Sequence, residues 1–275
     1  MSFSGRSEVV RGKDRSRVGL TLMELVVVMA VLAAVAAILI PLFPNLLRRA
    51  HKVTDATQSS EVAKAVQLFQ SLYVSYPDEW DYMTVSTGTT PPTFLPADGG
   101  NPFGGAAVIG NLTANEVAAL GRVGIASGHH FNATVGTGHP TLNPYSAAVT
   151  APTALTTTTP VFIIDPTTTS GEVPVEIKNI YLRDPTARFV VFGVGTRSTM
   201  VGKVMENAPT SVPQNKEFTP ATLYSRVGVI FQVAGTGILT TKRARFIGTA
   251  ALEDDELEST EKDIVNYYDI SNSGE

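Results

Sequence analysis

The chain has a polar, basic start that gives way to 23 consecutive uncharged residues, from Leu25 to Leu47. At 1.5 Å per residue, a helix of this length crosses the roughly 30 Å hydrocarbon layer of a membrane. The run contains Ala34-Val35-Ala36, which fits the cleavage site of a secretory signal peptide. Because apolar residues continue past that site as far as Phe43, the pattern favours a membrane-spanning helix over an ordinary cleaved signal.

An amphipathic pattern follows the apolar run. Val62, Val66, Phe69 and Tyr73 recur at intervals of three and four residues, which places them on one face of a helix. The same face is widened by Ala65, Leu68 and Leu72. We therefore predict one long helix of about 80 Å over residues 21–73, whose second half packs against a folded domain. It ends near Tyr76-Pro77, because proline disfavours helical geometry in the residue before it.

Two prolines interrupt the helical pattern. Pro41 and Pro44 have no backbone N–H, so the carbonyls of Ala37 and Ile40 lose their usual helical partners. We expect a bend or local unwinding of the helix at this point.

The remainder of the chain combines turns with strand-like runs. Residues 77–160 are rich in Gly, Pro and Thr and are predicted to be mostly loops. Within them, Thr113 and Glu116 match a capping box and predict a short helix up to Leu120. Five β-branched or aromatic runs predict strands: Val161 to Ile164, Val173 to Leu182, Phe189 to Val194, Val227 to Val233 and Ala244 to Ile247. The predicted connection between the last two is a hairpin loop at Ala234-Gly235-Thr236-Gly237.

These elements predict an α+β fold, with the long N-terminal helix packed on a C-terminal antiparallel sheet. The expected segments are a leader (1–19), a membrane-spanning helix (20–47), its amphipathic continuation (48–76), a loop-rich segment (77–160) and a β-rich part (161–275).

Charge and composition narrow the class of protein. The net charge is −4, but residues 1–19 hold five basic and two acidic side chains, which leaves 16 basic and 23 acidic residues elsewhere. An acidic body argues against a nucleic-acid-binding surface, which usually needs a basic stripe. The sequence has no cysteine, so disulfides and thiolate metal sites are excluded. The basic excess before the apolar run favours a cytoplasmic N-terminus with the body outside.

One charge stands at the front of the apolar run. Glu24 lies in Gly19-Leu20-Thr21-Leu22-Met23-Glu24-Leu25, and a carboxylate at the centre of a bilayer costs on the order of 2.5 to 3.5 kcal/mol. After a basic leader and before an apolar helix, this motif resembles the prepilin signature of type IV pilins and type II secretion pseudopilins. Pro41 also stands where many members carry a helix-bending proline. Leu20 departs from the pattern, since phenylalanine is usual there, and this leaves the subclass open. The resemblance covers about a fifth of the chain, from about Arg15 to Tyr73.

The resemblance implies a role for each residue of the motif. A prepilin peptidase would cut between Gly19 and Leu20, and the new amine of Leu20 would be N-methylated. In family filaments the glutamate equivalent to Glu24 pairs with the N-terminal amine of a neighbouring subunit. A carboxylate that reaches the headgroup level is the alternative role for Glu24. The implied partners are other copies of this chain or minor pilins, prepilin peptidase, inner-membrane lipid and the filament assembly machinery.

Other patterns offer weaker candidates for chemistry. Gly193-Val194-Gly195 follows a predicted strand, but Ser198 replaces the third glycine of a dinucleotide motif and no crossover helix follows. The spacing of His129, His130 and His139 matches no zinc pattern. No cofactor is therefore expected, with one open candidate in the acidic C-terminal stretch. Its possible calcium ligands are Asp254, Asp255, Glu256 and Asp263. The alternative is that this acidic stretch forms a solvated face of a helix.

Three functions remain in order of preference. The first is a non-enzymatic pseudopilin-like subunit, a single-pass inner-membrane protein whose body is periplasmic or extracellular and which polymerises into a filament. The second is a surface type IV pilin for adhesion, motility or DNA uptake, although many such pilins close a C-terminal loop with a disulfide that this chain cannot form. The third is an enzyme or ligand-binding domain anchored by the helix, against which the sequence offers only the absence of a recognisable catalytic motif.

Overall fold

A computed structural model describes residues 21–40, 43–86, 90–92, 94–95, 97–98, 101–131, 151–167, 173–210, 224, 226–252 and 257–259. The chain divides into two compact units, Met1–Pro44 and Asn45–Glu275. The described part combines an N-terminal apolar helix with an α+β body built on a mixed sheet.

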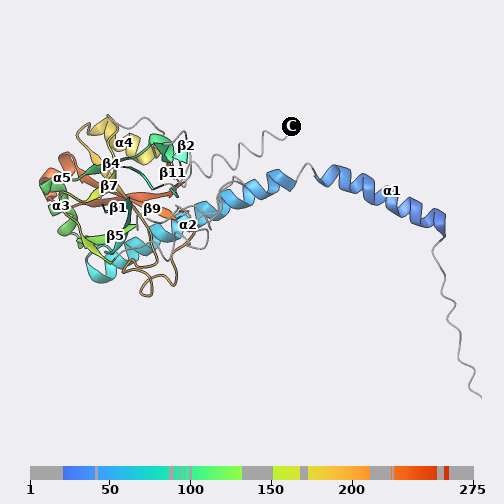
Figure 1. Ribbon diagram of the computed structural model, residues 1–275, viewed down its shortest axis with the longest axis horizontal. Helices are drawn as coiled ribbons and strands as arrows, with labels where there is room; N and C mark the ends of the chain where they lie inside the picture. Colours follow the sequence, from blue (N-terminus) through green and yellow to red (C-terminus); the bar gives the residue numbers. More distant parts are fainter. Residues whose placement is uncertain are drawn as a thin grey trace, which may run out of the picture. The chain divides into compact units, whose positions relative to one another are not determined.

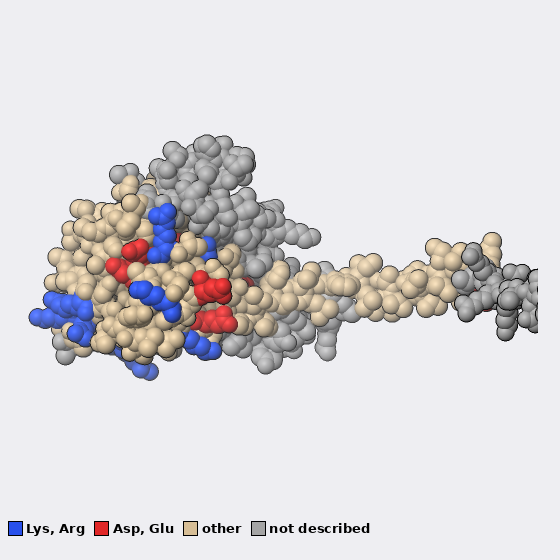
Figure 2. Space-filling model, turned by 90° about the horizontal axis from the view of Figure 1, so that it is seen from below, with Lys and Arg blue, Asp and Glu red and all other residues tan. Residues whose placement is uncertain are grey.

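Helix α1 spans Leu22–Leu39, and Thr21 caps its N-terminus. It has no buried residue, and Glu24 is its only charged residue, so nearly all of its described surface in Figure 2 is uncharged. It is the one helix within the described residues that is long and apolar enough to cross a membrane, although a signal sequence meets the same criteria.

Helix α2 spans Phe43–Tyr73. Pro44 falls in its first turn, where a missing N–H removes no bond within the helix. Pro41 lies outside the described residues, so the predicted bend is not described. The helix ends at Tyr73, three residues before Tyr76, because Val74 adopts a positive φ of 58°.

Helix α2 buries apolar side chains in its C-terminal half and polar side chains in its N-terminal half. Its C-terminal half buries Val62, Ala65, Val66 and Phe69, whereas Leu68, Leu72 and Tyr73 are about half exposed or more. Its N-terminal half buries polar side chains at the same spacing: Lys52, Asp55 and Ser59. The hydroxyl of Thr249 donates to the carbonyl of Ser59 at 2.9 Å, which ties this helix to strand β10.

One sheet organises the body (Figure 1). Among the described residues its strands run in the order β11-β10-β9-β8-β1-β5-β6, with β7 also beside β8 and β4 beside β7. The strands are β1 (Trp80–Val85), β4 (Val108–Asn111), β5 (Ser127–Phe131), β6 (Thr153–Ala154), β7 (Pro160–Ile164), β8 (Arg188–Gly193), β9 (Val227–Ala234), β10 (Arg245–Leu252) and β11 (Leu257–Ser259). A separate two-stranded sheet pairs β2 (Ala97–Asp98) with β3 (Asn101–Pro102), followed by a 3-10 turn, η2 (Phe103–Gly105).

The sheet was predicted to be antiparallel, but it is mixed. Strands β1 and β5 pair in parallel, while the other pairs of the main sheet are antiparallel. Both parallel strands come from the segment predicted to be loop-rich, which also supplies β2, β3, β4 and β6. The prediction relied on continuous β-branched or aromatic runs. Such residues are interrupted by Asp81 and Met83 in β1, which reads WDYMTV, and are nearly absent from β5, which reads SGHHF.

Two elements differ from the predicted strands and loops. Helix α4 (Val175–Arg183) replaces the predicted strand Val173 to Leu182; Pro174 precedes its first turn, where a fixed φ favours a helix start. The predicted hairpin loop at Ala234–Gly237 is wrong in its extent, because helix α5 (Thr236–Thr241) begins within it and lengthens the connection between β9 and β10. The strands around it pair antiparallel as expected. Helix α3 (Ala114–Gly121) confirms the predicted capping box of Thr113 and Glu116.

The side chains of the sheet pack on both of its faces. Alternate residues of β8 point to opposite sides: Val190 and Phe192 join one core, and Phe189 and Val191 join the other. The first core includes Val62, Val66 and Phe69 of α2 together with residues of α3 and β9. The second includes Ile177 of α4. The sheet is therefore the middle layer of the body, with α2 and α3 on one face and α4 on the other (Figure 1).

Candidate functional site

The start of α1 carries the residues that the sequence singled out. Oε2 of Glu24 accepts hydrogen bonds from the backbone N–H of Thr21 at 2.8 Å and from its hydroxyl at 3.0 Å. The backbone N–H of Glu24 donates to the Thr21 hydroxyl oxygen at 3.3 Å, which completes a capping box. Thr21 is extended, with φ −68° and ψ 151°, as a capping residue should be. Glu24 is exposed and is bonded within its own first turn.

Most of the other predicted site residues lie outside the part of the chain that the structure describes. Gly19, Leu20 and Pro41 lie outside the described residues, as do the calcium candidates Asp254, Asp255, Glu256 and Asp263. For Pro44 only the backbone is described, within α2.

The two adjacent histidines lie in strand β5 and are buried. Nε2 of His129 is 3.4 Å from Oε2 of Glu79, an ion pair when the imidazole is protonated. The other ring contacts β1: Nδ1 of His130 lies 3.2 Å from the hydroxyl of Thr84, and burial lowers the pKa of His130. Since successive residues of a strand point to opposite faces, the two imidazoles do not converge. Within the described part of the chain no three His, Asp or Glu side chains are placed to hold a metal ion.

The Gly193-Val194-Gly195 pattern has a steric explanation. A Cβ on Gly193 would overlap the hydroxyl of Tyr224, and a Cβ on Gly195 would overlap the carboxylate of Asp81. The two glycines thus leave room for a buried pair, in which the hydroxyl of Tyr224 donates to Oδ2 of Asp81 at 2.7 Å. The close approach of Tyr224 and Asp81 accounts for both glycines.

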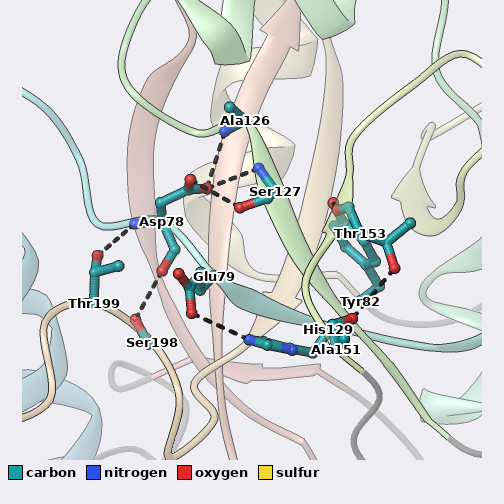
Figure 3. Close-up of polar contacts among 10 residues, drawn as sticks. All are labelled: Asp78, Glu79, Tyr82, Ala126, Ser127, His129, Ala151, Thr153, Ser198 and Thr199. Carbon is teal, nitrogen blue, oxygen red and sulfur yellow. Dashed lines mark hydrogen bonds and ion pairs between the residues drawn. The ribbon is translucent and has the colours of Figure 1, made fainter.

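A second carboxylate, Asp78, joins three loops (Figure 3). Its Oδ1 accepts from the backbone N–H groups of Ala126 and Ser127, both at 2.9 Å, and its Oδ2 accepts from the Ser127 hydroxyl at 3.0 Å. On the backbone side, the N–H of Asp78 donates to the Thr199 hydroxyl at 2.8 Å, and the N–H of Thr199 donates to the Asp78 carbonyl at 3.0 Å. Asp78 therefore connects the chain before β1 to the chain before β5 and the chain after β8.

The sequence did not single out Asp78, Asp81 or Tyr224. Asp78 follows Pro77, and Asp81 interrupts an aromatic run between Trp80 and Tyr82. A charged residue within an apolar run was the signal that drew attention to Glu24, and the same signal was present at Asp81. Asp81 could not be recognised from the sequence because its hydrogen-bond partner, Tyr224, lies 143 residues away.

Comparison with known proteins adds no relative: no family model, no curated protein and no solved structure matches this chain.

Proposed function

We propose that this chain is a structural, non-enzymatic subunit of a pseudopilus or related type IV pilus-like filament. It is anchored in the inner membrane by α1, processed by a prepilin peptidase between Gly19 and Leu20, and polymerises through its N-terminal helix. The observation that carries the proposal is Glu24, which stands in a prepilin-like motif at the first turn of an otherwise uncharged helix with no buried residue.

The physical argument concerns how a carboxylate is tolerated among apolar helices. Thr21 satisfies only Oε2 of Glu24, through two hydrogen bonds, and neither donor carries a charge. In an apolar bundle an ion of opposite sign is needed to offset the cost of the charge. Cleavage before Leu20 creates an amine four residues before Glu24 in the sequence, and a neighbouring copy presents the same amine.

The rest of the fold is consistent with this role. The buried face of α2 attaches the helix to the sheet, so that force on the helix reaches the body through Val62, Val66 and Phe69. The absence of cysteine favours a pseudopilus over a surface pilus with a disulfide-closed loop. Filament length in electron micrographs separates these two forms, because a pseudopilus is the shorter.

The first test is mass spectrometry of the protein extracted from membranes. The expected N-terminal peptide begins at Leu20 and carries one added methyl group. A chain that still begins at Met1, or one trimmed beyond Ala36, contradicts the proposal.

The second test separates the charge of Glu24 from its hydrogen bonds. Glu24→Gln keeps an acceptor for Thr21 but removes the charge, and breaking a buried ion pair typically costs about 3 to 5 kcal/mol. We expect loss of filaments in electron micrographs at an unchanged level of membrane-bound subunit. The control is Glu61→Gln, the same change at an exposed position of α2, which should assemble normally. Equal filament yields from the two variants would remove the pairing role.

A further inference from the structure

Asp81 is a carboxylate in the interior of the body. It lies in β1, and only 3% of its surface is exposed. The strand around it is irregular: Glu79 and Met83 both have positive φ, 59° and 61°, and the pairing of β1 with β5 shifts register between Asp81 and Val85. Left-handed backbone at non-glycine residues is strained, and such strain clusters at sites with a special role.

The hydrogen bonds of Asp81 are incomplete. Oδ2 accepts the Tyr224 hydroxyl at 2.7 Å, whereas Oδ1 is buried and has no hydrogen-bond partner among the described residues. A carboxylate accepts several hydrogen bonds when it is ionised. One bond from a neutral hydroxyl does not replace its hydration, so the site suits a protonated carboxyl better than a charged carboxylate.

Tyr224 links Asp81 to a different part of the body. Its ring is fully buried and packs edge-on against Phe131 with a centroid separation of 5.1 Å. Its backbone N–H donates to the carbonyl of Phe94 at 2.7 Å. Tyr224 precedes β9 by three residues. The Asp81 contact thus fastens β1 to the chain that leads into β9.

Charged groups on three other segments act on Asp81. Burial raises the pKa of Asp81 from its ordinary value of 3.8 to about 6, and the Tyr224 hydrogen bond and the positive charges of His129, Arg226 and Arg197 oppose this rise without cancelling it. An acidic group also contacts this set: Oε2 of Glu79 lies 3.4 Å from Nε2 of His129.

We propose that the closure of Tyr224 and the start of β9 over Asp81 is a pH-sensitive clasp, stable while Asp81 is protonated and destabilised when Asp81 ionises. The hydrogen bond from Tyr224 to the carboxylate offsets only part of the cost of burying the charge, because Oδ1 stays without a partner among the described residues. Ionisation places an incompletely solvated charge against Gly195, and water reaches that charge only if Tyr224 and the start of β9 move away. The clasp acts within the body and holds whether or not the chain assembles into filaments.

The direction of the pH effect follows from the raised pKa of Asp81. The native chain binds more protons at this group than the unfolded chain does between pH 4 and pH 6, so stability falls as pH rises through this window. The stabilisation is fully present below pH 4 and is lost above pH 6. A rise of about two pKa units corresponds to an increase of about 100-fold in the unfolding constant.

Trp80 offers a direct readout, because it is the only tryptophan, it is fully buried and it precedes Asp81. The experiment is urea unfolding of the full chain in detergent, followed by Trp80 fluorescence between pH 4 and pH 8. The ratio of the unfolding constants of the wild type and Asp81→Asn cancels the contributions of titrating groups that do not interact with Asp81. We expect this ratio to rise about 100-fold from pH 4 to pH 7, and a ratio independent of pH overturns the clasp.

A second variant keeps the test decisive if Asp81→Asn does not fold. Tyr224→Phe retains the ring and Asp81 but removes the hydrogen bond that favours the ionised form. The fall in stability should then move to higher pH, because Asp81 becomes harder to ionise. A fall that stays at the wild-type pH, or moves to lower pH, overturns the proposal.

Discussion

Val74 occupies the position directly after α2 with a backbone conformation that β-branched residues rarely adopt. Its φ is 58°, and 85% of its surface is exposed, so no packing repays the strain. Its backbone N–H still donates to the carbonyl of Gln70 at 2.9 Å, which completes the end of the helix. Glycine is the usual residue after a helix for this reason.

Replacing Val74 by glycine should therefore stabilise the body by about 1 kcal/mol, since the left-handed penalty outweighs the added freedom of the unfolded chain. Urea unfolding followed by Trp80 fluorescence measures the change. Val53→Gly is the matched control, because Val53 is also exposed but lies within α2, where glycine is unfavourable. If Val74→Gly lowered the free energy of unfolding as Val53→Gly is expected to do, the backbone of Val74 would not be strained.

At the scale of elements, the start of α3 depends on one buried carboxylate. Oε2 of Glu116 accepts from the backbone N–H of Thr113 at 2.7 Å, and Oε1 accepts from Nη1 of Arg188 at 2.6 Å. Arg188 opens β8, and its Nε is 3.7 Å from Oδ2 of Asp165, which follows β7. One capping residue thereby connects a helix to two strands of the sheet.

Glu116→Ala should destabilise the body by roughly 3 kcal/mol, as it removes a cap and leaves the charge of Arg188 with a weaker partner. Thermal unfolding followed by circular dichroism measures this loss. Glu176→Ala makes the same substitution in the first turn of α4, where the side chain is exposed, and should cost less than 1 kcal/mol. Equal losses would mean that the ion pair with Arg188 contributes nothing beyond the helix start.

At the scale of the whole molecule, the chain joins a helix that buries nothing to a body with two packed cores. The apolar surface of α1 is long enough to cross a membrane, and in the proposed filament lipid or other apolar helices would cover it. On the face of the body in Figure 2, Lys and Arg lie among Asp and Glu, as on an ordinary water-facing surface.

The pair Val28→Lys with Leu32→Lys should release the chain from the membrane fraction. Each lysine near the centre of a spanning helix costs about 2.5 to 3.5 kcal/mol. Alkaline carbonate extraction followed by immunoblotting measures the distribution. The control pair, Val53→Lys with Leu72→Lys, changes exposed residues of α2 and should leave the chain in the membrane pellet. Retention of the α1 variant in the pellet would contradict membrane insertion of α1.

The features that the sequence by itself determined are those whose causes are local. The apolar span, the buried residues Val62, Val66 and Phe69, the cap of Thr113 and the strands β7, β8 and β9 depend on composition and spacing within a few residues. Helix α4 went unrecognised because its β-branched residues also fit a strand, and Pro174 before it fits a strand start as well as a helix start.

Only the tertiary structure decided which distant segments meet. The parallel pairing of β1 with β5 and the contact of Asp81 with Tyr224 join positions that no local pattern relates. The same holds for Gly193 and Gly195, whose missing side chains make sense only once Asp81 and Tyr224 lie against them. The physical reason is that local periodicity records which side of an element is buried, whereas the partner on that side is selected by the packing of the whole body.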